Sequence, residues 1–265
     1  GVSYLVKTDK HTILFDVGFN RKKESPSPLE HNMEALGVKL DDIDTIFFSH
    51  AHRDHLGGTA WEKSRSFSLG MSQRDLGKKT VFAPVPLTYP NQPVQVVAQP
   101  RALLPGVAST GPIPRRLMLG RVDEQALIIH IKGRGLVAMV GCGHQTIPKL
   151  VEHIRETFSE PLIGIIGDVH YPTPQGRLFI AGIDAQRWLA SGDGPRRPIT
   201  GEQVHSELKL LEQRLEFLAL GAHDTSDEAL THAASVFGDR FEAVTVGKPI
   251  RLDGRRGGAM TSQRM

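Results

Sequence analysis

One short segment of the chain brings together several side chains that bind metal ions in proteins. Residues 49–58 contain His50, His52, Asp54 and His55, which place three imidazoles and a carboxylate within six positions. Imidazole nitrogens and carboxylate oxygens suit zinc, manganese or iron. The alternative interpretation is a surface loop that happens to be rich in histidine. Because the segment directly follows the apolar run at 45–48, where a buried strand would end, we predict that it binds metal.

Further candidate ligands follow three other apolar runs. Each run ends in a glycine, and His or Asp follows within three residues: Cys142 and His144 after the first, Asp168 and His170 after the second, His223 and Asp224 after the third. In α/β proteins, ligands gather at the carboxyl ends of strands. We therefore expect these loops to converge on the first segment. An isolated buried cysteine is usually a packed, inert residue, and this is the interpretation we prefer for Cys142.

The elements that must position these side chains form a mixture of strands and helices. Apolar and alternating runs predict strands at 2–7, 12–16, 45–48, 126–131, 136–140, 162–166, 217–220 and 243–246. Helical spacing and capping residues predict helices at 29–36, 147–158 and 184–190, and two more that begin at Thr200 and Thr225. The proline-rich stretch 61–123 is typical of an irregular insertion with edge strands. This mixture indicates an α/β architecture with helices covering sheet.

Composition excludes several classes of protein. A single cysteine among 265 residues rules out an intrachain disulfide, a zinc finger and an iron–sulfur site within this sequence. No apolar run reaches the roughly 18 residues of a membrane-spanning helix. The net charge of +3 arises at one end, because residues 248–265 carry +4 and the rest of the chain −1. We expect a small-molecule substrate, and neither nucleic acid nor a membrane as partner.

The pattern His-x-His-x-Asp-His resembles the signature of the metallo-β-lactamase superfamily of binuclear metal hydrolases. The resemblance covers nearly the whole chain. Within the superfamily, the chain is most similar to the branch that contains dihydropterin synthases of the methanopterin pathway. That branch has Gly-Cys-x-His as at 141–144, Gly-x-x-His as at 167–170, and a final His where His223 stands. The chain departs from the branch at Asp168 and directly after His223, so the pterin substrate does not transfer.

The resemblance implies an αββα sandwich, two packed β-sheets flanked by helices. We expect one such domain at 1–253, lacking its native N-terminal strand, and a basic disordered tail at 254–265. We expect a cytoplasmic location. Because the sequence begins at Gly1 without an initiator Met, a removed targeting segment stays an open alternative. Asp16 matches an acidic residue that supports the metal loop in that fold.

The resemblance also implies a role for each candidate ligand. One metal would be held by His50, His52 and His144, and the other by Asp54, His55 and His223. Asp168 is the candidate bridging carboxylate; His170 competes for that place or contacts substrate. The implied cofactor is a pair of divalent ions, zinc in the first place and manganese or iron otherwise.

Two cations about 3.5–4 Å apart would lower the pKa of a bridging water, so that a hydroxide forms near neutral pH. The sequence thus predicts a hydrolase in which this hydroxide attacks an ester-type substrate, a phosphoester or lactone in preference to a β-lactam. Asp54 would also orient the nucleophile and is the candidate catalytic residue. The rival hypothesis is a non-catalytic metal- or ligand-binding protein on the same fold.

Overall fold

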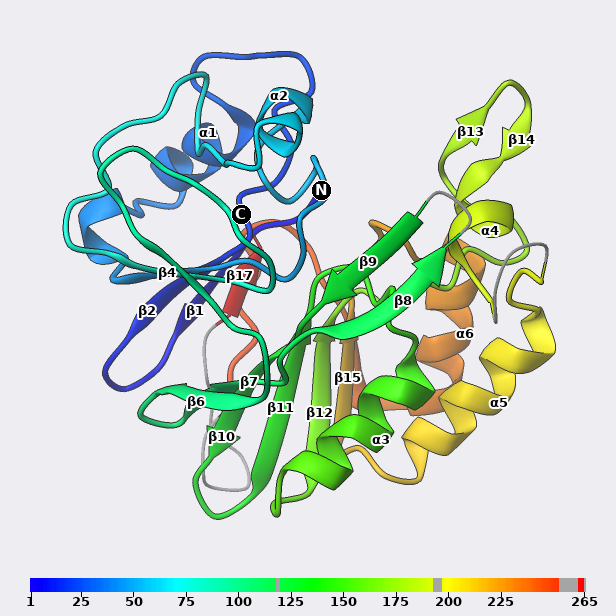
Figure 1. The fold of residues 1–265 in the computed structure, drawn as a ribbon. Helices are drawn as coiled ribbons and strands as arrows, with labels where there is room; N and C mark the ends of the chain where they lie inside the picture. Colours follow the sequence, from blue (N-terminus) through cyan, green and yellow to red (C-terminus); the bar gives the residue numbers. More distant parts are fainter. Residues whose placement is uncertain (118–119, 193–196, 253–261, 265) are drawn as a thin grey trace.

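Two β-sheets pack face to face in the computed structural model, which describes residues 1–117, 120–192, 197–252 and 262–264 (Figure 1). The first sheet has the order β17-β1-β2-β3-β4-β5. Its strands are β1 (Tyr4–Lys7), β2 (Thr12–Phe15), β3 (Thr45–Phe47), β4 (Thr80–Ala83), β5 (Val94–Val96) and β17 (Ser262–Arg264). The second sheet has the order β16-β15-β12-β11-β10-β7-β6. Its strands are β6 (Arg101–Leu104), β7 (Val107–Ser109), β10 (Leu127–Ile131), β11 (Gly135–Val140), β12 (Leu162–Gly167), β15 (Phe217–Leu220) and β16 (Phe241–Ala243).

The alternation of apolar side chains along each strand builds the layers. On β11, Val137 and Met139 point to the core between the sheets, whereas Ala138 points to the helices outside. The first sheet contributes Phe15 and Phe47 to the same inner core, with ring centroids 5.4 Å apart. Because β2, β3, β11 and β12 are buried on both faces, they form apolar runs without polar alternation.

Helices cover the outer face of each sheet (Figure 1). The second sheet is covered by α3 (Ile147–Thr157), α5 (Gly201–Glu212) and α6 (Asp227–Phe237), and the first by α1 (Pro28–Ala35) and α2 (Thr59–Lys63). On α3, Leu150, Val151 and Ile154 lie on one buried face, as the sequence spacing predicts. The αββα sandwich is therefore confirmed. Two one-turn helices, η1 (Leu40–Asp42) and η2 (Gly238–Arg240), complete these layers.

The proline-rich stretch 61–123 is more regular than the sequence suggests. It supplies β4 and β5 to one edge of the first sheet and β6 and β7 to one edge of the second. It also contains a hairpin that we did not predict, formed by β8 (Ile113–Leu117) and β9 (Gly120–Glu124). A second small hairpin, β13 (Phe179–Ile180) and β14 (Ile183–Asp184), precedes α4 (Ala185–Ala190).

Three predictions differ from the structure near the end of the chain. The last long strand lies at Phe241–Ala243 and not at 243–246. Ser226 caps α6 in place of Thr225, because the Thr225 hydroxyl donates to Asp168 (2.8 Å). Of the predicted tail 254–265, Ser262–Arg264 pairs with β1 as β17, while 254–261 and 265 lie outside the described residues.

The direction of the strands places the candidate ligands together. Strands β2 to β5 run parallel to one another, and so do β11, β12, β15 and β16. The loops that leave the carboxyl ends of β3, β11, β12 and β15 carry the predicted ligands. Among the described residues, no helix is both long and apolar enough to cross a membrane.

Candidate metal centre

The strand-end loops of both sheets meet at a cavity of about 520 Å³. Among the residues predicted as ligands, His52, Asp54, His144 and His223 line this cavity. His170, the predicted substrate contact, lines it as well. The cavity therefore draws side chains from the loops after β3, β11, β12 and β15, as the sequence predicts.

His50 and His55 lie fully buried behind this wall and are fixed by one carboxylate. Asp16 accepts hydrogen bonds from the Ser49 backbone (2.8 Å) and the Ser49 hydroxyl (2.6 Å). Its Oδ2 also lies 2.7 Å from Nδ1 of His55, while the Ser49 hydroxyl lies 2.9 Å from Nδ1 of His50. An imidazole held at one nitrogen presents the other in a fixed direction, which is how supporting groups orient metal ligands. Asp16 thus supports the metal loop, as the resemblance implies.

Asp54 joins the first motif to the loop after β15. Its Oδ2 lies 2.8 Å from Nε2 of His223 and 3.7 Å from Nε2 of His55. Burial alone would raise the pKa of Asp54, but His55 and His223 outweigh burial and hold it well below its usual value. The Asp54 carboxylate is therefore ionised at neutral pH and can act as a ligand or accept a proton.

Three imidazoles of this cluster, those of His50, His52 and His144, hold their neutral, ligand-competent form. Burial, reinforced by neighbouring imidazoles, lowers the pKa of His50 and of His144 well below the usual value. For His52, burial is again the largest cause, and the pKa is about 4. His55 differs: burial lowers its pKa, but Asp16 and Asp54 outweigh burial and raise it. A cation at His55 would have to displace a proton.

His144 and His170 provide the test of whether a metal fits. Each side chain is 5% exposed, and none of their four ring nitrogens forms a hydrogen bond to the described residues. His170 has one looser contact, from Nδ1 to Oδ2 of Asp224 at 3.4 Å. Buried polar atoms without partners are costly unless a ligand satisfies them. The donor set at this point of the cavity therefore fits a divalent cation.

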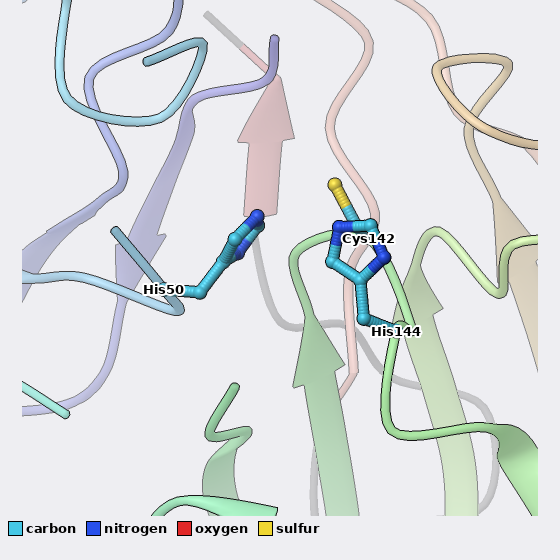
Figure 2. Close-up of side chains that lie close together, drawn as sticks. All are labelled: His50, Cys142 and His144. Carbon is cyan, nitrogen blue, oxygen red and sulfur yellow. The ribbon is translucent and has the colours of Figure 1, made fainter. Parts of the chain in front are cut away.

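Cys142 lies closer to the candidate ligands than we expected. Its Sγ is 3.0 Å from Nε2 of His55, and it can form a group of three ligand atoms with His50 and His144 or with His55 and His223. Figure 2 shows His50 reaching from the loop after β3 towards the loop that carries Cys142 and His144. Burial raises the pKa of Cys142 well above its usual value, so the thiol is protonated unless a cation lowers that pKa.

Asp168 and Asp224 differ in what their carboxylates contact. The Asp168 carboxylate accepts hydrogen bonds from the backbone of His223 (3.1 Å) and Asp224 (3.2 Å) as well as from Thr225. It therefore holds the loop after β15. Asp224, and not Asp168, forms a group of three candidate ligands with His144 and His170. The sequence offers one signal for Asp224, its position beside His223 at a strand end.

Glu124 holds the loop that carries Cys142 and His144, and we did not predict this role from the sequence. Its fully buried carboxylate accepts hydrogen bonds from the backbone of Cys142 (2.9 Å), Gly143 (3.0 Å) and His144 (2.7 Å). Burial raises its pKa, although these three bonds oppose the shift. Glu124 ends β9, and because that hairpin could not be predicted, nothing in the sequence pointed to this residue.

The sequence profile described as Metallo-beta-lactamase superfamily matches residues 1–223. The chain belongs to this superfamily. One relative, 7,8-dihydropterin-6-methyl-4-(beta-D-ribofuranosyl)-aminobenzene-5'-phosphate synthase of Methanocaldococcus jannaschii, is 21% identical over an alignment that covers 71% of this chain and 76% of the synthase. The predicted resemblance to the dihydropterin synthase branch of the metallo-beta-lactamase superfamily is thus confirmed.

Two further comparisons show what the chain is similar to. The Probable RNase MJ4 of the same organism is 34% identical over 76 residues, but these make up 29% of this chain and 16% of the RNase. A crystal structure described as a metal-dependent hydrolase of the beta-lactamase superfamily superposes with a TM-score of 0.55. It is 16% identical, with 92% of this chain and 96% of that chain covered, and it confirms the metallo-β-lactamase fold.

Proposed function

We propose that this protein is a metal-dependent hydrolase that cleaves a small ester-type substrate. The observation that carries the proposal is that six histidines and an ionised Asp54 lie at one cavity or directly behind it, with His50, His52 and His144 in the neutral form. The unbonded ring nitrogens of His144 and His170 support metal binding there. Membership of a generally hydrolytic superfamily supports hydrolysis.

Two groups of residues would hold the metal ions. We propose His50, His52 and His144 for one ion, and Asp54, His55 and His223 for the other, with zinc as the metal. Zinc accepts thiolate, imidazole and carboxylate together, so Cys142 beside His55 favours zinc over manganese. Asp168 as a bridging ligand stays a prediction, and Asp224 is its rival in the structure.

Bound divalent cations would supply an activated water as nucleophile and would stabilise negative charge on the substrate. The residues of the chain would do the rest. Asp54 is ionised, faces the cavity, and can accept a hydrogen bond from the attacking water and so orient it. His170 also faces the cavity and can donate a hydrogen bond to substrate. Because nine-tenths of His144 and His170 is buried, bulk water is kept away from this wall.

A phosphoester or lactone is our preferred substrate class, ahead of a β-lactam. The preference rests on the similarity to the synthase, whose name contains a 5'-phosphate. We do not extend the pterin to this chain, because Asp168 and Asp224 stand where the branch has other residues.

The experiment that tests the proposal combines metal content with turnover. Protein purified without added metal is analysed for zinc, manganese and iron. It is then assayed with bis(4-nitrophenyl) phosphate, a γ-lactone, a thioester and a β-lactam in the presence of each metal. The His50→Ala variant should lose bound metal, and its turnover should fall at least about a hundredfold.

His205→Ala is the matched control, because His205 is an exposed histidine on α5 that lies outside the cavity. It should keep both metal and turnover. Full turnover by His50→Ala would contradict the proposal. Bound metal without turnover of any substrate in the panel would favour the rival hypothesis, a non-catalytic binding protein.

A further inference from the structure

The β13–β14 hairpin and α4 expose an unusual amount of apolar surface. Nine large hydrophobic side chains of the described residues are exposed, and five of them lie within 178–188: Leu178, Phe179, Ile180, Ile183 and Trp188. Their exposed fractions range from 44% to 58%. Such a concentration on one short segment marks a surface that binds something apolar. Figure 1 shows the hairpin projecting from the body of the molecule, above α6.

One face of this hairpin belongs to the cavity that holds the candidate ligands. Leu178 and Ile180 both line the cavity together with His144 and His223, whereas Phe179 does not. Alternate residues of a strand point to opposite faces, which explains the difference. Phe179 is nevertheless exposed to the same degree, 47% against 46% for Leu178. The hairpin therefore has an apolar face towards the site and another towards solvent.

A second hairpin also contributes apolar side chains to the cavity. Leu117 and Val122, on the β8–β9 hairpin, line it, and Leu189 on α4 extends the surface formed by Leu178 and Ile180. The candidate ligands form one part of the cavity wall. The apolar side chains of the two hairpins, with Arg121 and Arg177 beside them, form another part, which we call the apolar end. Apolar surface of this kind, beside a few convergent polar groups, is typical of a small-molecule site.

The hairpin is tied directly to the loop after β15. Gln186 on α4 is 5% exposed and donates a hydrogen bond to Asp224. Its Oε1 accepts a hydrogen bond from the backbone of Arg177 (2.6 Å), and the Arg177 guanidinium contacts the carbonyl of Thr225 (3.3 Å) and the carboxylate of Asp227 (2.6 Å). The base of the hairpin is therefore fixed relative to the candidate ligands, so its apolar face has a defined place in the cavity.

We propose that the apolar end of the cavity binds the acyl chain of a carboxylic ester or lactone, so that the protein prefers esters of medium-length acids to short ones. This narrows the substrate class proposed above from phosphoesters and lactones to acyl compounds. The inference rests on the proposed function and deepens it. The apolar end is continuous with the ligand cluster, and a carbonyl placed at the cluster would direct its chain between the two hairpins. Burial of the chain would cover Leu178 and Ile180, whose exposure to water is otherwise unfavourable.

The test uses 4-nitrophenyl butyrate and octanoate, which share a leaving group and differ only in chain length. For the wild-type protein, kcat/KM should be at least about tenfold higher for octanoate, chiefly through KM. Ile180→Asp should remove this preference by lowering kcat/KM for octanoate to about the value for butyrate. Phe179→Asp is the matched control, because it puts the same charge on the other face of the same strand, and it should keep the preference. Leu178→Asp provides a second variant on the cavity face.

A binding measurement separates this inference from the proposed hydrolysis. By calorimetry, the free octanoate anion should bind the wild-type protein at least about tenfold more tightly than the free butyrate anion. Ile180→Asp should abolish this difference in affinity. If neither ester is hydrolysed but octanoate binds in this way, the proposed reaction fails and the acyl site stands. Equal turnover and equal binding of the two chain lengths would overturn the acyl site alone. A dimer that Ile180→Asp dissociates, without any chain-length preference, would assign the face to a second copy and also overturn it.

Discussion

At the scale of single residues, the centre depends on a carboxylate that has no contact with the cavity. Asp16 has two oxygens and satisfies three donors with them, two from Ser49 and one from His55. Supporting groups of this kind fix the tautomer and the direction of a ligand, and their loss lowers metal affinity about 10–100-fold. The candidate ligands of the segment 49–58 therefore depend on Asp16, which lies 34 residues before His50 in the sequence.

We predict that Asp16→Asn lowers zinc affinity about 10–100-fold, because an amide nitrogen would face donors where an oxygen now accepts. It should also lower the free energy of unfolding by about 1–3 kcal/mol through the loss of buried hydrogen bonds. Chelator competition measures the affinity, and urea unfolding measures the stability. Asp9→Asn, in an exposed turn, is the control and should change neither. Unchanged zinc affinity of Asp16→Asn would show that Asp16 does not orient His55.

At the scale of elements, the centre requires two strand ends to approach closely. Gly141 directly follows β11 and lies against Ser49, which follows β3. A Cβ at Gly141 would lie 2.2 Å from the Ser49 hydroxyl, and Asp16 holds that hydroxyl in place. The two sheets therefore meet at this point only because residue 141 has no side chain.

We predict that Gly141→Ala lowers the free energy of unfolding by about 1–3 kcal/mol and weakens zinc binding, because the loop with Cys142 and His144 is pushed away from Ser49. Urea unfolding and zinc titration would measure the two effects. Gly201→Ala, on α5, is the matched control, since a Cβ there meets nothing within 4 Å, and it should be neutral. Full stability and affinity of Gly141→Ala would mean that the sheets move apart at no cost.

A second prediction at this scale concerns a helix away from the cavity. Thr200 caps α5 by accepting a hydrogen bond from the backbone of Gln203 (3.2 Å), and the Gln203 side chain accepts one from the Thr200 backbone (2.9 Å). Thr200→Ala should lower the free energy of unfolding by about 1 kcal/mol. Metal content should stay at the wild-type level, because the cap lies outside the cavity. A loss of metal in this variant would link α5 to the centre in a way that the contacts do not predict.

At the scale of the whole molecule, the buried imidazoles couple folding to pH. His50, His52 and His144 have lowered pKa values in the folded protein, about 4 for His52. In the unfolded chain the same groups take up protons near pH 6.5. Below that pH the unfolded state therefore binds more protons than the folded state, and stability falls as the pH falls. His55, whose pKa is raised, is protonated in both states in this range and adds no slope.

We predict that the chelator-treated protein loses stability steadily between about pH 6.5 and pH 4. Urea unfolding at several pH values would measure the decline. In His52→Gln, the free energy of unfolding should fall less steeply with falling pH, because His52 no longer takes up a proton on unfolding. Excess zinc should oppose the decline at the upper end of the range, because a cation that binds the folded state stabilises it by mass action. A stability profile that is flat from pH 6.5 to pH 4 would contradict the burial of neutral imidazoles.

The sequence by itself determined the fold class and the core of the candidate centre. The apolar runs that become β3, β11, β12 and β15 indicate strands buried on both faces, and a parallel arrangement brings their carboxyl ends to one edge. Residue type and position after a strand end are local properties. They were therefore enough to select His50, His52, Asp54, His55, His144, His170 and His223, all of which the structure brings to the cavity or directly behind it.

Only the tertiary structure decided which polar groups face the candidate ligands and which support the loops around them. Asp168 and Asp224 both follow strands, and the sequence cannot tell that Asp168 turns to the backbone of the next loop while Asp224 faces His144 and His170. Glu124 and the apolar face at Leu178 and Ile180 depend on two hairpins in loops with little periodicity. The residues that follow a strand end can be predicted from their local spacing in the sequence. A contact between distant loops forms only when the two sheets pack against each other, so local spacing does not predict it.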